Sequence, residues 1–465
     1  MSEQSPAKNR DIDVLRSRLE GEVHVRGEEG YQSSIDGFNT LSPVAPDLVV
    51  VAAGEEDVQQ AVRFALTHDL PVAVQATGHG SYRRVDRGVL IRTHLMNAVS
   101  VDADAGTFTV QAGVRWADIL PRLAEHGLAA VTGSSPTVSA VGLVLGGGLG
   151  PFSRTLGWAA DRAVSFRVVD GSGDLLEVSA DESPDLFRAL KGGKVGLGVV
   201  TSMTARAVPL REVYGGGLFF AQEHIADVHR AWLDWAVALP EAANTSIAIL
   251  RMPPEGVPEP LAGRTLAHVR YAYVDPGLDA AALIEAGEFL LAPLRAVAPI
   301  HLDAVGPMPA ADVGAIHADP PGPLPVWEYG EFLDEVDRDY VDTVLRHAGA
   351  DADAPFAMVE TRIMGGAIPR DADAPNAIGG RRAHFALLVV AAVPPGQWDA
   401  ISAKGDALFA DVAPYLHAEV NYNWAGHPAG RFDRVWSPET SRFLAAVRQK
   451  HDPRGLFDVG VKADA

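Results

Sequence analysis

One histidine in the chain stands between two glycines, in a setting that could serve a bound cofactor. The segment Ala76-Thr77-Gly78-His79-Gly80-Ser81 directly follows Val72–Gln75, an apolar run that predicts a β-strand. The flanking glycines remove side-chain bulk that would keep a ligand away, and successive backbone N–H groups in such a turn can form an anion-binding nest. A diphosphate would suit this turn. Taken alone, however, a Gly-His-Gly tripeptide is more often a surface turn with a solvated histidine.

A second glycine-rich segment, from Gly133 to Gly150, favours the binding interpretation, because two permissive loops indicate one extended ligand. Neither loop is a dinucleotide-binding Gly-x-Gly-x-x-Gly, since Pro151 follows at once and the strand-turn-helix context is missing. Gly192-Gly193-Lys194 is not a P-loop, because Val195 stands where a magnesium-binding Ser or Thr is needed. The signatures of serine hydrolases and zincins are absent from the sequence.

Composition narrows the class of protein further. The 465 residues include 60 acidic and 39 basic ones, a formal net charge of -21, which disfavours nucleic acid as a partner. The sequence has no Cys, so disulfides, thiolate catalysis and Cys-ligated zinc are excluded, and we expect no metal site. No apolar run reaches the length of a membrane span, and Met1–Asp13 lacks the hydrophobic stretch of a secretory signal. We therefore expect a cytoplasmic protein that does not bind membranes.

The elements that must position these loops predict an α+β protein. Strands are expected in the first part at 49–53, 72–75, 89–91, 108–112 and 163–169, with helices at 55–68 and 116–126. From about residue 209 the pattern predicts one antiparallel sheet covered by helices. Its strands are expected at 213–220, 245–251, 265–274, 358–363 and 385–392, and its helices at 224–238, 278–291 and 340–348. The Pro-rich stretch 307–325 predicts a loop or lid, and 437–451 predicts a helix near the C-terminus.

With these segments in view, the sequence resembles the berberine-bridge-enzyme-like FAD-linked oxidases, a branch of the vanillyl-alcohol-oxidase superfamily with a PCMH-type FAD-binding domain. The likeness covers almost the whole chain. It rests on motifs that occur in the family's order, namely 78–80, 110–116, 136–150, 157–161, 185–193, 198–201, 365–368, 420–422 and 452–457.

The resemblance implies an FAD flavoprotein in which His79 is bonded to the 8α-methyl group of the flavin. A neutral imidazole is a competent nucleophile near neutral pH. Many relatives add a second link through a Cys, and here that position is Ser135, so the covalent link is expected through His79 only. The residues expected to contact the cofactor are Ala76, Thr77, Gly78, His79, Gly80, Ser81, Gly133, Ser135, Val138, Gly142, Gly147, Gly148, Gly150, Asp161, Val200 and Asn421.

The resemblance also addresses the reaction. Val138 occupies the position that gates oxygen in relatives, and its small side chain favours an oxidase over a dehydrogenase. Substrate oxidation needs a group that takes a proton as hydride leaves. Glu360 is one candidate, because it alternates with Arg362 on one face of a strand; an exposed ion pair on the sheet is an equal alternative. Glu419 stands where many relatives have Tyr, and Tyr422 is the third candidate.

We therefore expect an FAD-binding domain over 1–208, a substrate-binding domain over 209–415, and a segment over 416–465 that returns to the first domain. The expected reaction removes hydride from a C–H bond next to O or N of a small secondary metabolite and passes the electrons to O2, giving H2O2. A flavin dehydrogenase with another acceptor and a non-catalytic flavoprotein that sequesters a small molecule are the alternatives. The expected partners are the small-molecule substrate and O2. The protein is expected to be a monomer or a homodimer.

Overall fold

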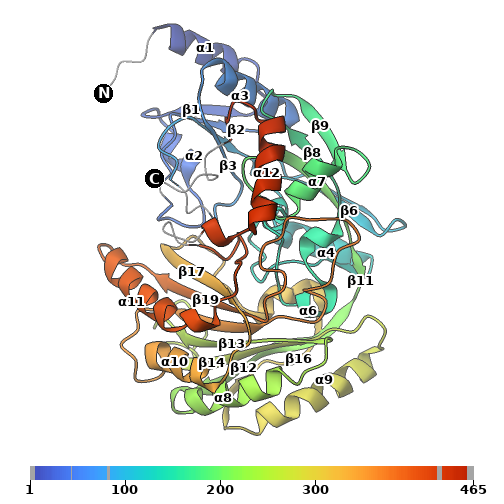
Figure 1. The fold of residues 1–465 in the computed structure, drawn as a ribbon, viewed down its shortest axis with the longest axis vertical. Coiled ribbons are helices and arrows are strands. Elements are labelled where there is room, and N and C mark those ends of the chain that lie inside the picture. The colour runs from blue at the N-terminus through green and yellow to red at the C-terminus, as the bar shows by residue number, and fades with distance from the viewer. Residues whose placement is uncertain (1–5, 43, 81–83, 427–431, 458–465) are drawn as a thin grey trace.

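The computed structural model describes residues 6–42, 44–80, 84–426 and 432–457. It is an α+β structure in which one half of the molecule carries two sheets and the other half is built on a single large sheet (Figure 1). None of the helices in the described residues combines the length and apolar character needed to cross a membrane. The fold class predicted from the sequence is therefore confirmed.

The first sheet forms because short β-branched runs pair in parallel around β4. Its strand order is β1-β2-β4-β3, with β1 antiparallel and the other three parallel. The strands are β1 (Glu22–Val25), β2 (Leu48–Val51), β3 (Val72–Gln75) and β4 (Val89–Arg92). The helices of this region are α1 (Pro6–Arg16), α2 (Tyr31–Ile35) and α3 (Glu55–Thr67). Three acidic residues open α3, which suits the positive end of a helix.

The second sheet is antiparallel, in the order β5-β6-β10-β8-β9. Its strands are β5 (Val99–Asp102), β6 (Thr107–Gln111), β8 (Ala163–Val169), β9 (Leu175–Ser179) and β10 (Val199–Arg206), and β7 (Leu128–Ala129) pairs separately with β11 (Val208–Pro209). The accompanying helices are α4 (Trp116–Glu125), α5 (Ala140–Leu145), α6 (Ser153–Leu156), α7 (Pro184–Leu190) and the 3-10 turn η1 (Ala159–Arg162).

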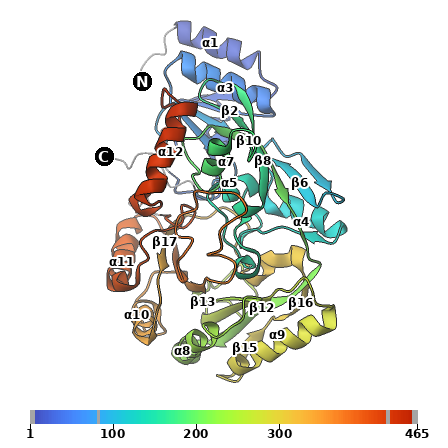
Figure 2. The same ribbon diagram turned by 45° about the vertical axis from the view of Figure 1, so that its right-hand side comes forward.

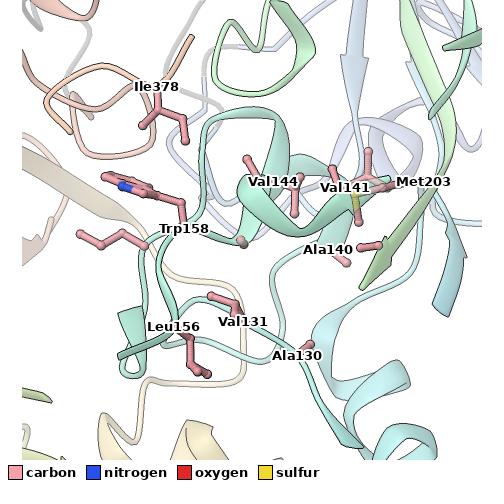
Figure 3. Close-up of a cluster of buried hydrophobic side chains, with 14 of the residues drawn as sticks. Ala130, Val131, Ala140, Val141, Val144, Leu156, Trp158, Met203 and Ile378 are labelled. Atoms are coloured by element: carbon pink, nitrogen blue, oxygen red, sulfur yellow. The ribbon is translucent and has the colours of Figure 1, made fainter. Parts of the chain in front are cut away.

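A hydrophobic core around the short helix α5 fixes the second glycine-rich segment. Ala140, Val141 and Val144 of this helix are buried, and Met203 of β10 and Trp158 belong to the same cluster (Figure 3). The loops on either side of α5 are thus held in place by burial of apolar surface.

The large sheet has the order β15-β12-β14-β13-β18-β19-β17, with β16 also paired to β12. Its strands are β12 (Glu212–Ala221), β13 (Ala243–Arg251), β14 (Thr265–Tyr273), β15 (Ile300–Asp303), β16 (Gly306–Pro309), β17 (Val326–Leu333), β18 (Met358–Ile363) and β19 (Phe385–Ala392). The predicted antiparallel sheet is confirmed, with β15, β16 and β17 added.

Helices cover the face of this sheet that points away from the first half (Figures 1 and 2). They are α8 (Ile225–Ala236), α9 (Ala280–Arg295), α10 (Arg338–Ala348) and α11 (Trp398–Asp411). The short 3-10 turns are η2 (Gln222–His224), η3 (Ala310–Ile316), η4 (Ala413–Tyr415) and η5 (Phe432–Arg434). Trp327 and Tyr329 of β17 belong to the core beneath these helices. The Pro-rich stretch 307–325 is only partly irregular, because it contains most of β16 and all of η3.

The end of the described chain returns to the first sheet. Helix α12 (Pro438–His451) contacts α7, and the backbone N–H of Val72 donates a hydrogen bond to the carbonyl oxygen of Leu456, 2.7 Å away. Leu456 and Phe457 are buried in the same core as the first sheet.

Candidate active site

His79 lies where the two glycine-rich segments meet. It follows β3, its ring stacks on Phe38 with centroids 3.6 Å apart, and its Nε2 lies 3.0 Å from Oγ1 of Thr137. Thr137 Oγ1 in turn lies 3.0 Å from Oγ of Ser135. Ser135 is thus linked to His79 through one threonine.

Burial determines the charge of this histidine. Loss of water lowers the pKa of His79 to about 4, although the carboxylate of Asp319 acts in the opposite direction. At neutral pH the imidazole is therefore uncharged and keeps a lone pair on one ring nitrogen. A neutral imidazole is the form that can act as a nucleophile.

A cavity of about 690 Å³ opens beside His79. Of the predicted cofactor residues, Ala76, Thr77 and His79 line it, and Thr137, which the sequence did not single out, lines it as well. The remaining lining comes from the loop after α2, the ends of β4 and β6 with the segments that follow them, helix α4 and the loop before β17. Its residues are Asp36, Gly37, Phe38, Arg92, His94, Asn97, Gly113, Arg115, Asp118, Arg122, Pro321 and Pro323. This volume lies within the range of small-molecule and cofactor sites.

The residues present fit a flavin dinucleotide. Both side-chain polar atoms of Gln75 are buried without a partner, as are Nε of Arg92 and Oγ1 of Thr93, all at the ends of β3 and β4. Arg92 also lines the cavity and supplies positive charge beside the turn that would hold a diphosphate. Gly78 adopts a φ of +77°, and a Cβ at this residue would lie only 2.5 Å from Nε2 of Gln75. The turn before His79 therefore requires glycine.

The other predicted cofactor residues surround this centre or have protein partners. Asp161 accepts two hydrogen bonds from Arg381, at 2.6 and 3.1 Å, and Asn421 donates from Nδ2 to the carbonyl oxygen of Gly146 at 2.8 Å. Val200 is buried in β10 and belongs to the core around α5. A Cβ at Gly150 would meet the carbonyl oxygen of Thr132, so packing alone explains that glycine.

Gly80 faces open space; Gly133, Val138, Gly142, Gly147 and Gly148 lie before, within and directly after α5. Ser81, and Tyr82 beside it, lie outside the described residues.

A second, much smaller pocket of about 20 Å³ lies between the second glycine-rich segment and the large sheet. Leu149 and Gly150 line it from one side. The side chains of Ser246, Arg270 and Arg362 line it from three strands of the large sheet. The lining is completed by Pro151, Arg154, Asn244, Thr245, Tyr271, Ala272, Ile316, His317, Ile363 and Ile368.

Glu360 is buried next to this pocket in a cluster of charged groups. Its Oε1 lies 2.9 Å from Nη2 of Arg362 and 3.1 Å from Nη1 of Arg270. Burial alone would raise the pKa of Glu360, but the guanidinium groups of Arg362 and Arg270 lower it well below its usual value. The alternation predicted for Glu360 and Arg362 therefore produces an ion pair, buried rather than exposed, and makes this carboxylate a weak proton acceptor.

Glu419 and Tyr422 line neither pocket. Glu419 accepts a hydrogen bond from the backbone N–H of Gly380 through Oε2, at 3.0 Å. The ring of Tyr422 packs against Phe432 and Trp436, with centroids 5.2 and 5.9 Å away. Their proposed part in proton transfer stays a prediction.

Phe38 and His317 line the two pockets without any local signal in the sequence, and Lys194, from the segment rejected as a P-loop, lines neither pocket but contacts α5. Phe38 meets His79 from a loop near the N-terminus, and His317 enters the second pocket after η3. Lys194 adopts a left-handed backbone with φ of 50°, and its Nζ donates to the carbonyl oxygen of Gly142 and to Oδ1 of Asn423, at 2.9 and 2.6 Å. Burial lowers its pKa to about 8. Phe38 and His317 come to the site by tertiary packing, which local spacing does not reveal.

Comparison with known proteins agrees with this geometry. Residues 46–179 match the family model described as FAD binding domain. The FAD-linked oxidoreductase pgmH of Aspergillus terreus is 35% identical over 228 residues, which cover 48% of this chain and 46% of that protein. The crystal structure of 6-hydroxy-D-nicotine oxidase from Arthrobacter nicotinovorans superposes with a TM-score of 0.79 at 23% identity, covering 96% of this chain and 98% of that one. BBE-like 1 of Physcomitrella patens gives a TM-score of 0.81 at 17% identity, covering 96% and 97%.

Residues 46–179 are thus an FAD-binding domain, and the chain has the fold of the berberine-bridge-enzyme-like proteins. The resemblance stated from the sequence is confirmed at these two levels. The chain spans about half the length of the curated relatives it matches.

Proposed function

We propose that this protein is an FAD-dependent oxidase that holds its cofactor covalently through His79 alone. The observation that carries the proposal is the junction at His79. There a neutral imidazole, the hydroxyl groups of Thr137 and Ser135, and the glycine-rich turn after β3 meet at a cavity of about 690 Å³.

Ala76, Thr77, Arg92 and Thr137 would hold the FAD. Bound there, FAD would supply a hydride acceptor for a C–H bond next to oxygen or nitrogen, with O2 as the final electron acceptor and H2O2 as its product. The absence of Cys leaves His79 as the residue for the link. Val138 keeps a small side chain at the position that would control oxygen access.

The chain's own residues would prepare the substrate in the second pocket. Leu149 and Gly150 close it on the side of the glycine-rich segment, and burial of the lining excludes water. Glu360 holds the guanidinium groups of Arg270 and Arg362 in fixed positions through the ion pairs described above. The carboxylate is therefore proposed to position these groups rather than to take the proton.

The cofactor proposal is tested on the purified protein by ultraviolet fluorescence on a denaturing gel together with intact mass. We expect a fluorescent band that carries the mass of one FAD, and His79→Ala should lose both signals. His347→Ala is the matched control, because His347 is a surface histidine paired with Asp411 and should leave both signals unchanged. Noncovalent yellow flavin in the supernatant would refute the covalent link, and a colourless protein would refute the flavin.

The electron acceptor is tested separately and needs no known substrate. The bound flavin is reduced with dithionite, and its reoxidation by O2 and by a quinone is followed by stopped-flow absorbance. An oxidase requires fast reoxidation by O2 with H2O2 as the product. Fast reaction with the quinone and slow reaction with O2 would identify the alternative, a flavin dehydrogenase.

A further inference from the structure

The second pocket lies on a row of side chains set by the strand register. Ser246 of β13 pairs with Arg270 of β14 on one side and with Arg362 of β18 on the other. Residues paired across antiparallel strands point to the same face of a sheet. The face concerned is the one opposite helices α8 to α11, so these three side chains point toward the first half of the molecule.

Four residues that line this pocket carry a buried polar atom without a partner. The atoms are Nε of Arg154, Oγ of Ser246, Nε of Arg270 and Nδ1 of His317. All four residues are at most 8% exposed. A buried polar group without a hydrogen bond costs free energy, so such a concentration indicates a missing ligand.

Each of these atoms can donate a hydrogen bond. Guanidinium nitrogens only donate, and a hydroxyl group can do so. Nε2 of His317 lies 2.8 Å from Nη2 of Arg362, which can only donate, and 3.4 Å from Oε1 of Glu360; the shorter contact makes Nε2 an acceptor. Burial lowers the pKa of His317 to about 4, so the neutral ring carries its hydrogen on Nδ1. The missing ligand is therefore an acceptor.

The charges around the pocket point to a negatively charged acceptor. Three guanidinium groups line it, those of Arg154, Arg270 and Arg362, and no carboxylate is among its lining residues in the described chain. Glu360, beside the pocket, balances one of these positive charges. Glu241 lies near Arg154 but is also paired with Arg370, so it does not balance Arg154 alone. Burial keeps His268, behind Arg270, neutral by lowering its pKa well below the usual value. A buried site with excess positive charge is stabilised by an anion.

We propose that this pocket binds an anionic group of the substrate, such as a carboxylate. The free volume of about 20 Å³ accommodates one or two water-sized groups, which matches the oxygen atoms of such an end group. Leu149 and Gly150 place this end beside the second glycine-rich segment, which also holds Thr137 of the cofactor cavity. The inference rests on the proposed function and names its substrate class.

The test compares acetate with acetamide, which has the same shape but no charge. Binding to the flavin-loaded protein is followed through the flavin absorption spectrum. We expect acetate to bind at least about tenfold more tightly than acetamide, because hydrogen bonds to charged groups are worth about 1.5–3 kcal/mol. Arg270→Gln should abolish this preference and leave acetamide binding unchanged. Arg295→Gln is the matched control, since Arg295 is paired with Glu288 and Asp303 at the far end of the sheet.

Ser246→Ala provides a second variant in case Arg270→Gln does not fold, and it should weaken acetate binding several-fold. Equal binding of acetate and acetamide by the unaltered protein would overturn the proposal. So would an Arg270→Gln protein with an unchanged preference for acetate, or a Ser246→Ala protein that binds acetate as tightly as the unaltered protein. If the protein contains no flavin, the proposed function fails. Binding of acetate and acetamide is then compared through tryptophan fluorescence, to which Trp424 contributes, because its ring lies 5.2 Å from the guanidinium carbon of Arg362.

Discussion

The buried carboxylate of Glu360 gives the sharpest test of how the large sheet is stabilised. Its side chain is 1% exposed, and Oε1 alone faces Arg362, Arg270 and Nε2 of His317 at 2.9, 3.1 and 3.4 Å. Glu360→Gln keeps the size of the side chain and one oxygen acceptor but removes the negative charge. The guanidinium groups of Arg270 and Arg362 would then share a buried site without a counter-charge.

The expected loss of stability is about 3–5 kcal/mol, the range found when one partner of a buried ion pair is removed. For a cooperative unit of 150–250 residues this corresponds to a fall of about 6 to 20 °C in the melting temperature. Differential scanning calorimetry of the purified protein at pH 7 measures it. The assay needs no substrate, so it remains independent of the proposed activity.

The matched control is Glu288→Gln, because Glu288 pairs with Arg295 but is 46% exposed. Exposed ion pairs contribute about 0–1 kcal/mol, so its melting temperature should stay within a few degrees of the unaltered protein. If Glu360→Gln and Glu288→Gln have the same melting temperature, the two buried guanidinium groups are not stabilised by the carboxylate of Glu360. Glu360 would then not be the group that balances the buried charges of Arg270 and Arg362.

Three further predictions concern pH and two packing features. Burial lowers the pKa of His229 to about 4, so between pH 6.5 and pH 4 only the unfolded chain takes up the proton. The contribution of His229 to the free energy of unfolding should be full above about pH 6.5 and fall by about 3 kcal/mol toward pH 4. In His229→Gln the melting temperature should therefore fall less between pH 6.5 and pH 4 than in the unaltered protein. Asp161→Asn should cost about 1–3 kcal/mol in urea unfolding, because the two charged hydrogen bonds from Arg381 are weakened. Gly147→Ala should lower the flavin content, because the φ of +108° at this residue disfavours a side chain. The ratio of visible to ultraviolet absorbance measures the flavin content, and a ratio equal to that of the unaltered protein would contradict this prediction.

The sequence predicts the regular elements well where the pattern is strong. Strands at 72–75, 163–169, 358–363 and 385–392 have the predicted bounds, because each is a short run rich in apolar and β-branched residues. Strand β17 was not predicted, since the alternation of Trp327 and Tyr329 with Glu328 and Gly330 indicates a mixed surface as readily as a strand.

The two parts of the site differ in how far the sequence could predict them. The cofactor part depends on segments with local signals, and His79 and Thr137 do come together as the two glycine-rich loops indicated. The substrate part depends on register between distant strands, which places Arg270 beside Arg362, and on a loop that brings in His317. Local spacing contains neither kind of information, so Glu360 could be placed on a strand face but its partners could not be named.

The return of the chain to the first sheet has a consequence for synthesis in the cell. Leu456 and Phe457 complete the core that β2, β3 and β4 begin, although almost the whole chain separates them from these strands. At about 5–20 residues per second, a ribosome needs about 20 to 80 s to make the intervening part. During that time α1 and α3 can pack on this core, but it lacks the two apolar side chains that complete it, and the neighbouring apolar surface is available to chaperones or to aggregation. A chain truncated after residue 451 would leave this core incomplete permanently.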